Sequence, residues 1–409
     1  MNVMYERCAG LDVHKDTVVA CARVVVDGKV KQEVRTFGTT TKELLTLSDW
    51  LREQGCTHAA MESTGVYWKP VWHILESSLT LVLANAMHIK NVPGRKTDVN
   101  DATWISDLLA HGLIRGSFVP PTPVQEMREL TRTRKQLVRE AAQHTQRIQK
   151  TLEDANIKLA SYLSDILGKS GRAILDAIVK GETDPEKLAD LASDRVKATR
   201  KELVEALRGR VDSHHRFLLK LHLAQIDNLN EAVRDVEARL GDALQPFRAL
   251  EGLLMTIPGV SATTAQVILS EIGTDMSRFP TAANLISWVG LCPSNDESAG
   301  KQRSKRLRKG GQWLKATLVQ SAWAASRKKG SYLKALFHRI RARGGPKKAA
   351  IAVAASMLTA AYHMLSTGVE YQELTEAYFT KRDRTKLARR LVKRLNDLGF
   401  TATITAVAA

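Results

Sequence analysis

The segment between residues 124 and 250 constrains the fold of this chain most, because it is compatible with little besides helices. Glycine and proline are scarce in it, and apolar residues recur at helical spacing. Pro120, Pro121 and Pro123 interrupt the chain just before it. Because 409 residues exceed what one hydrophobic core usually organises, we expect two to four domains. The helical segment, residues 124–250, is predicted to be a coiled-coil arm.

An apolar seam in the second half of the arm suggests the coiled coil, since its spacings alternate between three and four residues. The seam consists of Leu219, His222, Ile226, Leu229, Val233, Val236, Leu240, Ala243, Phe247 and Leu250. Spacing alone leaves two interpretations open: an antiparallel helix pair within one chain, or a dimerisation stalk. A bend between two arms is expected at residues 168–185.

Residues 1–123 alternate β-rich runs with helical patterns. We expect strands over residues 8–13, 17–26, 30–37, 58–61 and 79–83, and helices over 41–53, 66–76 and 97–111. Three strands in a meander, followed by strands that alternate with helices, indicate a mixed α/β sheet. The predicted fold class is therefore α/β plus α, with this sheet domain at the start of the chain.

Four carboxylates in this region form a candidate metal site. Asp12 lies in the first expected strand, and Glu62 follows a later one. Asp98 and Asp101 are three residues apart, and so lie on one face of a helix. Crowded carboxylates repel one another unless a divalent cation binds between them, and oxygen ligands suit magnesium or manganese better than zinc. Other nearby acids could be surface residues or alternative ligands: Asp16, Glu76 and Asp107.

The net charge of +18 is concentrated between residues 301 and 348, which contain sixteen lysines and arginines and no aspartate or glutamate. Exposed faces normally carry both signs of charge, so this run favours contact with a polyanion, nucleic acid first. The candidate phosphate contacts are Lys301, Arg303, Lys305, Arg306, Arg308 and Lys309. Residues 251–369 are otherwise predicted to be a mostly helical domain, followed by a basic helical tail over residues 370–409.

The run LLMTIPGVSATTAQVILSEIG, which begins at Leu253, is similar to a helix-hairpin-helix, whose backbone N–H groups can hold a phosphate. Ser261 stands where that motif usually has a second glycine, so a simple helix turn is the alternative. The alanine-rich residues 349–365 are too short for a membrane span and are expected to form a buried helix. Four cysteines without a CxxC pair, and no visible secretory signal, favour a reducing, cytoplasmic location.

Five separate stretches resemble the insertion sequence 110 family of transposases, and the resemblance extends over about residues 8–368. They are GLDVHKD, MESTGVYWKPVWHILE, KTDVNDATWISDLLAHGL, IPGVSATTAQVILSEIG and GLCPSNDESAGKQRSKRLRKGGQWLKATL. The resemblance implies a RuvC-like domain of ribonuclease H fold with its metal ligands at Asp12, Glu62, Asp98 and Asp101. It also implies a nucleophilic serine at Ser298. The residues alone do not select Ser298, because Ser294 and Ser304 are competitors.

The resemblance further implies transposition by DNA cleavage and rejoining, through a bond between Ser298 and a DNA phosphate, with magnesium or manganese at the acids. It implies a noncoding guide RNA that pairs with donor and target DNA. It also implies a homo-oligomer, from dimer to tetramer, in which acids and serine come from different subunits. Two other functions remain open: a RuvC-like endonuclease that hydrolyses DNA with water, and a noncatalytic nucleic-acid-binding protein.

Overall fold

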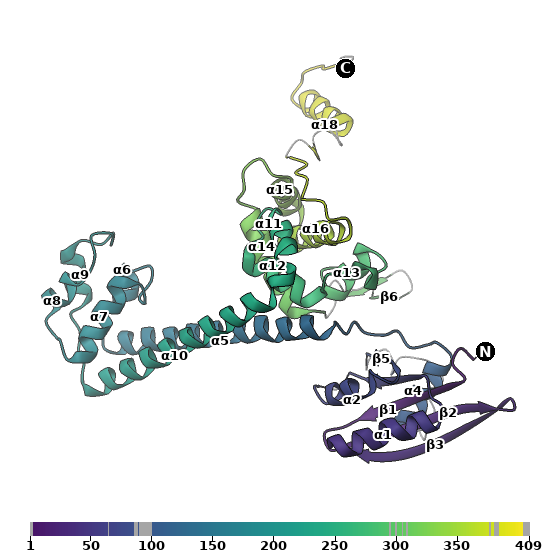
Figure 1. The fold of residues 1–409 in the computed structure, drawn as a ribbon. Helices are drawn as coiled ribbons and strands as arrows, with labels where there is room; N and C mark the ends of the chain where they lie inside the picture. Colours follow the sequence, from purple (N-terminus) through teal and green to yellow (C-terminus); the bar gives the residue numbers. More distant parts are fainter. Residues whose placement is uncertain are drawn as a thin grey trace. The chain divides into compact units, whose positions relative to one another are not determined.

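The computed structural model divides the chain into two compact units, residues 1–119 and 120–409 (Figure 1). It describes residues 3–63, 65–85, 89, 100–293, 296–298, 301–304, 306–307, 310–375, 378–379 and 384–403. Each unit has its own hydrophobic core.

The first unit contains a five-stranded mixed sheet with the strand order β3-β2-β1-β4-β5. The strands are β1 (Arg7–Val13), β2 (Thr17–Val26), β3 (Lys29–Gly38), β4 (His58–Glu62) and β5 (Thr80–Ala84). The first three form an antiparallel meander, whereas β4 pairs parallel to β1 and β5 parallel to β4. The predicted mixed α/β sheet is therefore confirmed.

Helices cover both faces of this sheet (Figure 1). Leu11 and Val13 of β1 share a core with α1 (Thr41–Glu53) and α2 (Trp68–Leu75). Cys8 of β1 and Ala60 of β4 share a second core with α4 (Asp101–Ala110). Successive residues of a strand point to opposite faces, so the even-numbered residues of β1 face α4. The helix expected over residues 97–111 is confirmed from Asp101; residues 97–99 lie outside the described part of the chain.

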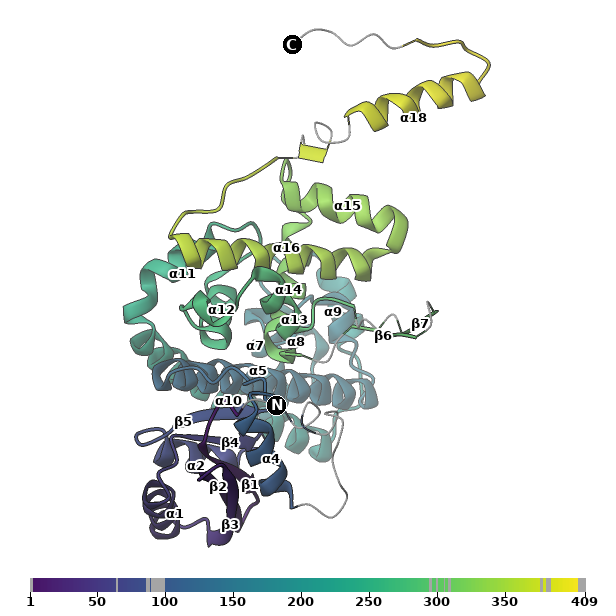
Figure 2. The same cartoon turned by 90° about the vertical axis from the view of Figure 1, so that its right-hand side faces the viewer.

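In the second unit, α5 (Thr122–Asp154) and α10 (Ser213–Ala243) lie side by side and run antiparallel (Figures 1 and 2). Three side-chain contacts give the register. They join Arg134 to Glu237, His144 to His222, and Asp154 to His215. Of the two interpretations left open by the seam, the structure shows the helix pair within one chain.

The seam is unevenly buried along this pair. Leu219, Ile226 and Leu240 are buried, whereas Leu229, Val233 and Val236 in the middle of the seam are only half-buried. The helix pair therefore buries only part of the seam fully. Coiled-coil geometry and association of this arm with a second chain remain predictions.

The connection between α5 and α10 differs from the single bend expected at residues 168–185. It is a cluster of four short helices: α6 (Leu159–Tyr162), α7 (Lys169–Lys180), α8 (Pro185–Asp190) and α9 (Arg200–Ala206). Ile174, Leu188 and Leu203 pack with Ile148 and Leu223 of the long helices in one core. The connection therefore includes more residues than the predicted bend, because its short helices bury apolar side chains and so form a stable cluster.

The rest of the second unit is mostly helical, as predicted. It comprises α11 (Arg248–Met255), α12 (Ala262–Ile272), α13 (Ala282–Val289), α14 (Gln312–Ala325), α15 (Tyr332–Gly344), α16 (Pro346–Thr367) and α18 (Arg384–Asp397), with two 3₁₀ turns, η1 (Gln245–Phe247) and η2 (Met276–Arg278), and a hairpin of β6 (Asp296–Ser298) and β7 (Lys301–Ser304).

By length and composition α16 could cross a membrane. Val353, Ala354 and Met357 are nevertheless buried where α16 packs against α14 and α15, as expected for a core helix.

Ser261 is the N-cap of α12, and its hydroxyl accepts a hydrogen bond from the backbone N–H of Thr264. Gly259 has a φ of 85°, and a Cβ there would lie 2.5 Å from the carbonyl oxygen of Ser321. The turn between α11 and α12 therefore requires its first glycine. A serine is favourable at the second position because α12 begins with a side-chain cap.

A buried carboxylate joins α5 to α12. Glu271 is 1% exposed, and both of its oxygens accept hydrogen bonds from Arg132, at 2.8 and 2.9 Å. Arg128 donates to the backbone carbonyls of Ser270 and Glu271, at 3.1 and 2.7 Å. A buried charge is tolerated only where it is paired and hydrogen-bonded, so these contacts fix the position of α5 on α12.

We expect Glu271→Gln to destabilise the second unit by about 3 kcal/mol, because it leaves two arginines without their buried counter-charge. Urea unfolding followed by far-ultraviolet circular dichroism measures the loss, since helices dominate this unit. Glu140→Gln, at an exposed position of α5, should change stability by less than about 0.5 kcal/mol. Equal midpoints for both variants would contradict the assigned role of Glu271.

The pKa of His222 is lowered, first by burial and then by the charges of His144 and Arg147. The unfolded chain therefore binds more protons than the folded chain below about pH 6.5, and the helix pair should lose stability as the pH falls through that value. His222→Gln should flatten this dependence, which urea midpoints at about pH 7.5 and 5.5 would measure. His214→Gln, at an exposed position of the same helix, should leave it unchanged.

Candidate active site

Asp12 and Glu62 lie side by side at the carboxyl ends of two paired strands. The parallel register of β1 and β4 places Leu11 beside Met61, so the next residue of each strand continues the pairing. Both residues follow the alternation that places Cys8 and Ala60 against α4. Adjacent strands are about 4.8 Å apart, so the two carboxylates share one edge and one face of the sheet. The side chain of Asp12 is 24% exposed.

The N-terminus of α4 lies at the same edge of the sheet, because this helix runs antiparallel to β1. At the far end, the backbone N–H groups of Met4 and Tyr5 donate to the carbonyl of Ala110. At Gly10, a Cβ would lie 2.1 Å from the carbonyl oxygen of Ala102. Only glycine permits the helix to rest on the strand so closely. Asp101 therefore stands at the carboxyl edge of β1.

Asn100 caps α4, and its side chain accepts a hydrogen bond from the N–H of Ala102. Asp101, the first residue of the helix, is exposed, and Asp98 lies outside the described residues. Three of the four predicted acids thus gather at one edge: Asp12, Glu62 and Asp101. Their oxygens are the donor type that magnesium prefers. Within the described part of the chain, no three acidic, histidine or cysteine side chains are close enough to hold one metal ion.

A histidine that sequence reasoning did not single out contacts this edge. The Nε2 atom of His14 lies 3.1 Å from the Oδ2 atom of Asp12, and the His14 side chain is 58% exposed. The signal was present in the sequence, because both residues belong to the stretch GLDVHKD. His14 can orient the carboxylate or hold a proton beside it.

Two of the alternative acids have other partners. Asp107 accepts hydrogen bonds from Arg23 and Gln32, both at 2.9 Å, and the Arg23 side chain is buried. Glu76, the C-cap of α2, accepts a hydrogen bond from the indole N–H of Trp72, at 3.0 Å. The third alternative, Asp16, is exposed in the turn after β1. The carboxylates of Asp107 and Glu76 are therefore engaged in hydrogen bonds away from the proposed metal site.

Two buried cysteines of this unit, Cys8 and Cys56, are unsuited to chemistry at neutral pH. Burial raises the pKa of the Cys8 thiol to about 12 and that of Cys56 to about 11. The thiolate is the nucleophile and metal ligand, so both groups stay protonated and inert. The reactive groups of this edge are oxygens and the His14 imidazole.

Ser298 lies in the second unit, at the last position of β6, where it pairs with Lys301 of β7. A further bridge joins Pro293 to Leu307 and extends the hairpin. Ser298 is thus next to the hairpin end, while the competitor Ser304 pairs with Asp296 at the other end. Ser294 lies outside the described residues, and so do the side chains of the whole hairpin.

Three of the six predicted phosphate contacts lie in or just beyond this hairpin. The backbones of Lys301 and Arg303 form part of β7, and Arg306 is exposed just beyond it. Lys305, Arg308 and Lys309 lie outside the described residues. The described backbone therefore places the first basic residues directly across the hairpin from Ser298.

Comparisons with known proteins identify the family of this chain. A family model of IS110 type, described as a transposase, matches residues 9–157. A second model, described as the transposase IS116/IS110/IS902 family, matches residues 251–338. Together the two segments make up more than half of the chain. The chain belongs to the IS110 family of transposases. The family predicted from the sequence stretches is thus confirmed.

Two curated relatives carry matching names. The "Insertion element IS110 uncharacterized 43.6 kDa protein" of Streptomyces coelicolor is 32% identical over 146 residues, which is 35% of each chain. A protein of Sinorhizobium fredii named as transposase y4pF/y4sB is 29% identical over 129 residues, which is 29% of this chain and 32% of that protein. The chain spans about a third of the length of these relatives.

We expect Gly10→Ala to displace α4 from β1, because the new methyl group would overlap the helix backbone at Ala102. The cost should be at least about 2 kcal/mol, as for other overpacked sites. Hydrogen–deuterium exchange of residues 101–110 in the full chain should become faster. Gly116→Ala, whose new Cβ would lie an ordinary 3.5 Å from Val82, is the matched control. Unchanged protection in Gly10→Ala would contradict the close packing.

Proposed function

We propose that this chain is a DNA transposase that excises and inserts an insertion sequence through a serine-phosphate intermediate at Ser298. The observation that carries the proposal is the shared edge of Asp12, Glu62 and Asp101. It lies within the segment that the IS110 transposase model matches. The strand order β3-β2-β1-β4-β5, with acids at the ends of β1 and β4, supports a RuvC-like domain of ribonuclease H fold.

The acids are proposed as the ligands of magnesium or manganese, with Asp98 as the fourth. The donor set fits a hard divalent cation, because every candidate ligand is a carboxylate oxygen. Such an ion would stabilise the attacking and leaving oxygens of a phosphodiester. The chain's own contribution is to hold Asp12 and Glu62 on paired strands, so that both carboxylates face the same space.

Ser298 is proposed to attack the scissile phosphorus with its hydroxyl oxygen. The new bond joins Ser298 Oγ to phosphorus, and the bond from phosphorus to one deoxyribose oxygen breaks. That oxygen takes up one proton and so becomes a hydroxyl, while the proton of Ser298 passes to solvent. A hydroxyl of the second DNA strand then attacks the phosphoserine. It loses its proton as it bonds to phosphorus, and the oxygen of Ser298 takes up a proton as it leaves. The number of phosphodiester bonds is conserved, so rejoining needs no external energy source.

The proposed partners are donor and target DNA, a noncoding guide RNA that pairs with both, and further copies of the chain, from dimer to tetramer. The acid-free run from residue 301 to 348 supports contact with nucleic-acid phosphates. Base pairing with the guide would supply sequence recognition, so protein side chains would contact mainly the backbone. We propose that the reaction takes place on the nucleoid in the bacterial cytoplasm.

The test is an assay for a covalent protein–DNA adduct on a denaturing gel, with magnesium, the flanking RNA of the element and labelled end-junction DNA. The wild type should form the adduct. Ser298→Ala and Asp12→Asn should each reduce it at least about a thousandfold, because each removes a group that acts in the chemical step. Ser304→Ala and Asp16→Asn are the matched controls and should retain the adduct.

Each contrary result has a definite meaning. Free cleavage products that persist in Ser298→Ala would show that water is the nucleophile, and the chain would be a hydrolytic endonuclease. Binding of DNA that survives removal of magnesium, without strand breakage in any variant, would show a noncatalytic nucleic-acid-binding protein. Either result would overturn the serine mechanism.

A further inference from the structure

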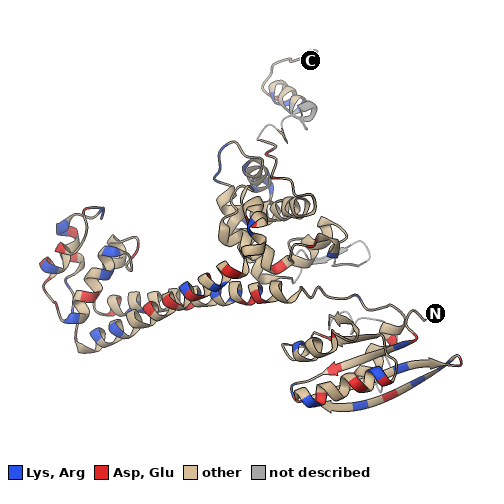
Figure 3. Ribbon diagram, viewed as in Figure 1, with Lys and Arg blue, Asp and Glu red and all other residues tan. Residues whose placement is uncertain are grey.

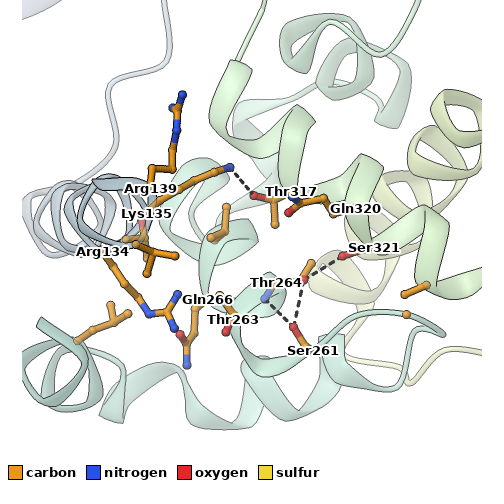
Figure 4. Close-up of a pocket in the computed structure, with 16 residues that line it drawn as sticks. Arg134, Lys135, Arg139, Ser261, Thr263, Thr264, Gln266, Thr317, Gln320 and Ser321 are labelled. Carbon is orange, nitrogen blue, oxygen red and sulfur yellow. Dashed lines mark hydrogen bonds between the residues drawn. The ribbon is translucent and has the colours of Figure 1, made fainter. Parts of the chain in front are cut away.

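A cavity of about 480 Å³ lies between α5, α12 and α14 in the second unit (Figure 4). Its volume is within the range of about 300–1,000 Å³ that is usual for ligand sites. Its lining carries the basic residues Arg134, Lys135 and Arg139, together with hydroxyl and amide groups, and no aspartate or glutamate. Along the α5–α10 pair, by contrast, basic and acidic residues are interspersed (Figure 3). The lining therefore favours an anionic ligand.

The three cations all line the cavity from α5, but they point in different directions and are not equivalent (Figure 4). Arg134 is neutralised by Glu237, whose carboxylate accepts its Nε hydrogen bond at 2.7 Å. Lys135 points across the cavity and donates to the hydroxyl of Thr317 at 3.4 Å (Figure 4). Arg139 is exposed at the rim. No carboxylate of the described residues forms an ion pair with either Lys135 or Arg139, so two positive charges at the cavity lack a counter-ion.

The setting of Lys135 is unfavourable for its charge when the cavity holds no anion. Burial is the main cause that lowers its pKa, and the positive charge of Arg139 lowers it further. The more distant Glu271 offsets this only in part, and the ammonium also lies 5.7 Å from the centre of the Trp313 ring. A bound anion would favour the charged form of Lys135.

The opposite wall of the cavity presents backbone donors. Ser261 caps only the N–H of Thr264 at the start of α12. The N–H groups of Ala262 and Thr263 have no backbone or side-chain acceptor in the part of the chain that the structure describes. Thr263 is exposed and lines the cavity. The first N–H groups of a helix favour an anion, so donors and cations face the same space from two sides.

We propose that this cavity binds a phosphodiester group of a nucleic-acid backbone. Lys135 and Arg139 contact it from α5, and the N–H groups of Ala262 and Thr263 contact it from α12. The inference rests on the proposed function only in taking nucleic acid as the ligand. The exposed rim at Val138 and Arg139 admits a polymer that continues past the cavity. The helices α5, α12 and α14 also come from both segments that the transposase models match.

The test measures equilibrium binding by fluorescence anisotropy, in EDTA, with a labelled duplex DNA of arbitrary sequence and separately with a labelled RNA hairpin. The double variant Lys135→Gln with Arg139→Gln should weaken binding of at least one probe about tenfold, because charge-assisted contacts to phosphate are lost. It should also reduce the slope of log affinity against log salt by about 1. The probe that responds identifies the polymer in the cavity.

Two further variants separate a specific site from general charge or from misfolding. Lys150→Gln with Arg234→Gln removes the same charge at exposed positions outside the lining and should weaken binding less than about twofold. Thr263→Glu adds a carboxylate to the cavity at a helix start, where acids stabilise helices, and should weaken binding while the melting temperature is unchanged or higher. Equal losses in both double variants, or full binding by Thr263→Glu, would overturn the inference.

The binding assay does not depend on strand cleavage. Loss of binding in the lining variant together with failure of adduct formation in the wild type would support the cavity and refute the serine mechanism. An adduct in the wild type, with unchanged binding by the lining variant, would support the serine mechanism and refute the proposed cavity site.

Discussion

The contact between α4 and β1 at Gly10 is the constraint on which the acidic edge depends. A helix normally lies about 10 Å from a sheet, separated by side chains. Here the helix backbone reaches the strand itself, since a Cβ at Gly10 would meet Ala102 and Ser106 at 2.1 and 2.4 Å. This close approach lets the first turn of α4, and with it Asp101, extend to the edge that carries Asp12 and Glu62. The glycine in GLDVHKD is therefore as necessary to the site as the aspartate two residues later.

The second unit depends on a buried charge instead. Glu271 binds Arg132 through both oxygens, and Arg128 binds the end of the same helix. These contacts set the rotation of α5 about its axis. Lys135 lies three residues beyond Arg132, about one helical turn, and so faces the cavity next to the buried pair. A change at Glu271 would thus alter both the packing of the unit and the direction of the cavity's cations.

Much of the first unit could be predicted from the sequence, because its signals are local. The β-rich runs predicted β1 to β5 to within one or two residues. Local patterns could not predict that Asp12 and Glu62 lie side by side, because this follows from the parallel register of two strands that are 50 residues apart in the sequence. The contact of His14 with Asp12 depends on side-chain geometry that no periodicity reports.

The second unit was harder to predict because its decisive contacts join distant segments. The apolar pattern of residues 159–206 was visible, but their packing into a separate cluster depends on Ile148 and Leu223, which lie on two other helices. The seam spacing was equally compatible with one chain or two. The cavity cations could not be predicted from charge, because the net positive charge of the chain is concentrated in the run from residue 301 to 348. Lys135 and Arg139 lie in a segment that also contains acids, and only the fold separates them from a counter-ion.

The two candidate sites are electrostatic opposites, and this follows from what they are proposed to contact. Carboxylates at Asp12, Glu62 and Asp101 repel a phosphodiester until a cation neutralises them, so they cannot by themselves retain a nucleic acid. Retention must come from cations elsewhere, and these must not pair with the chain's own acids. A cation of the arm fails this condition where an acid pairs with it, as Glu237 pairs with Arg134. Lys135 and Arg139 meet it, because the fold brings them to a lining without carboxylates.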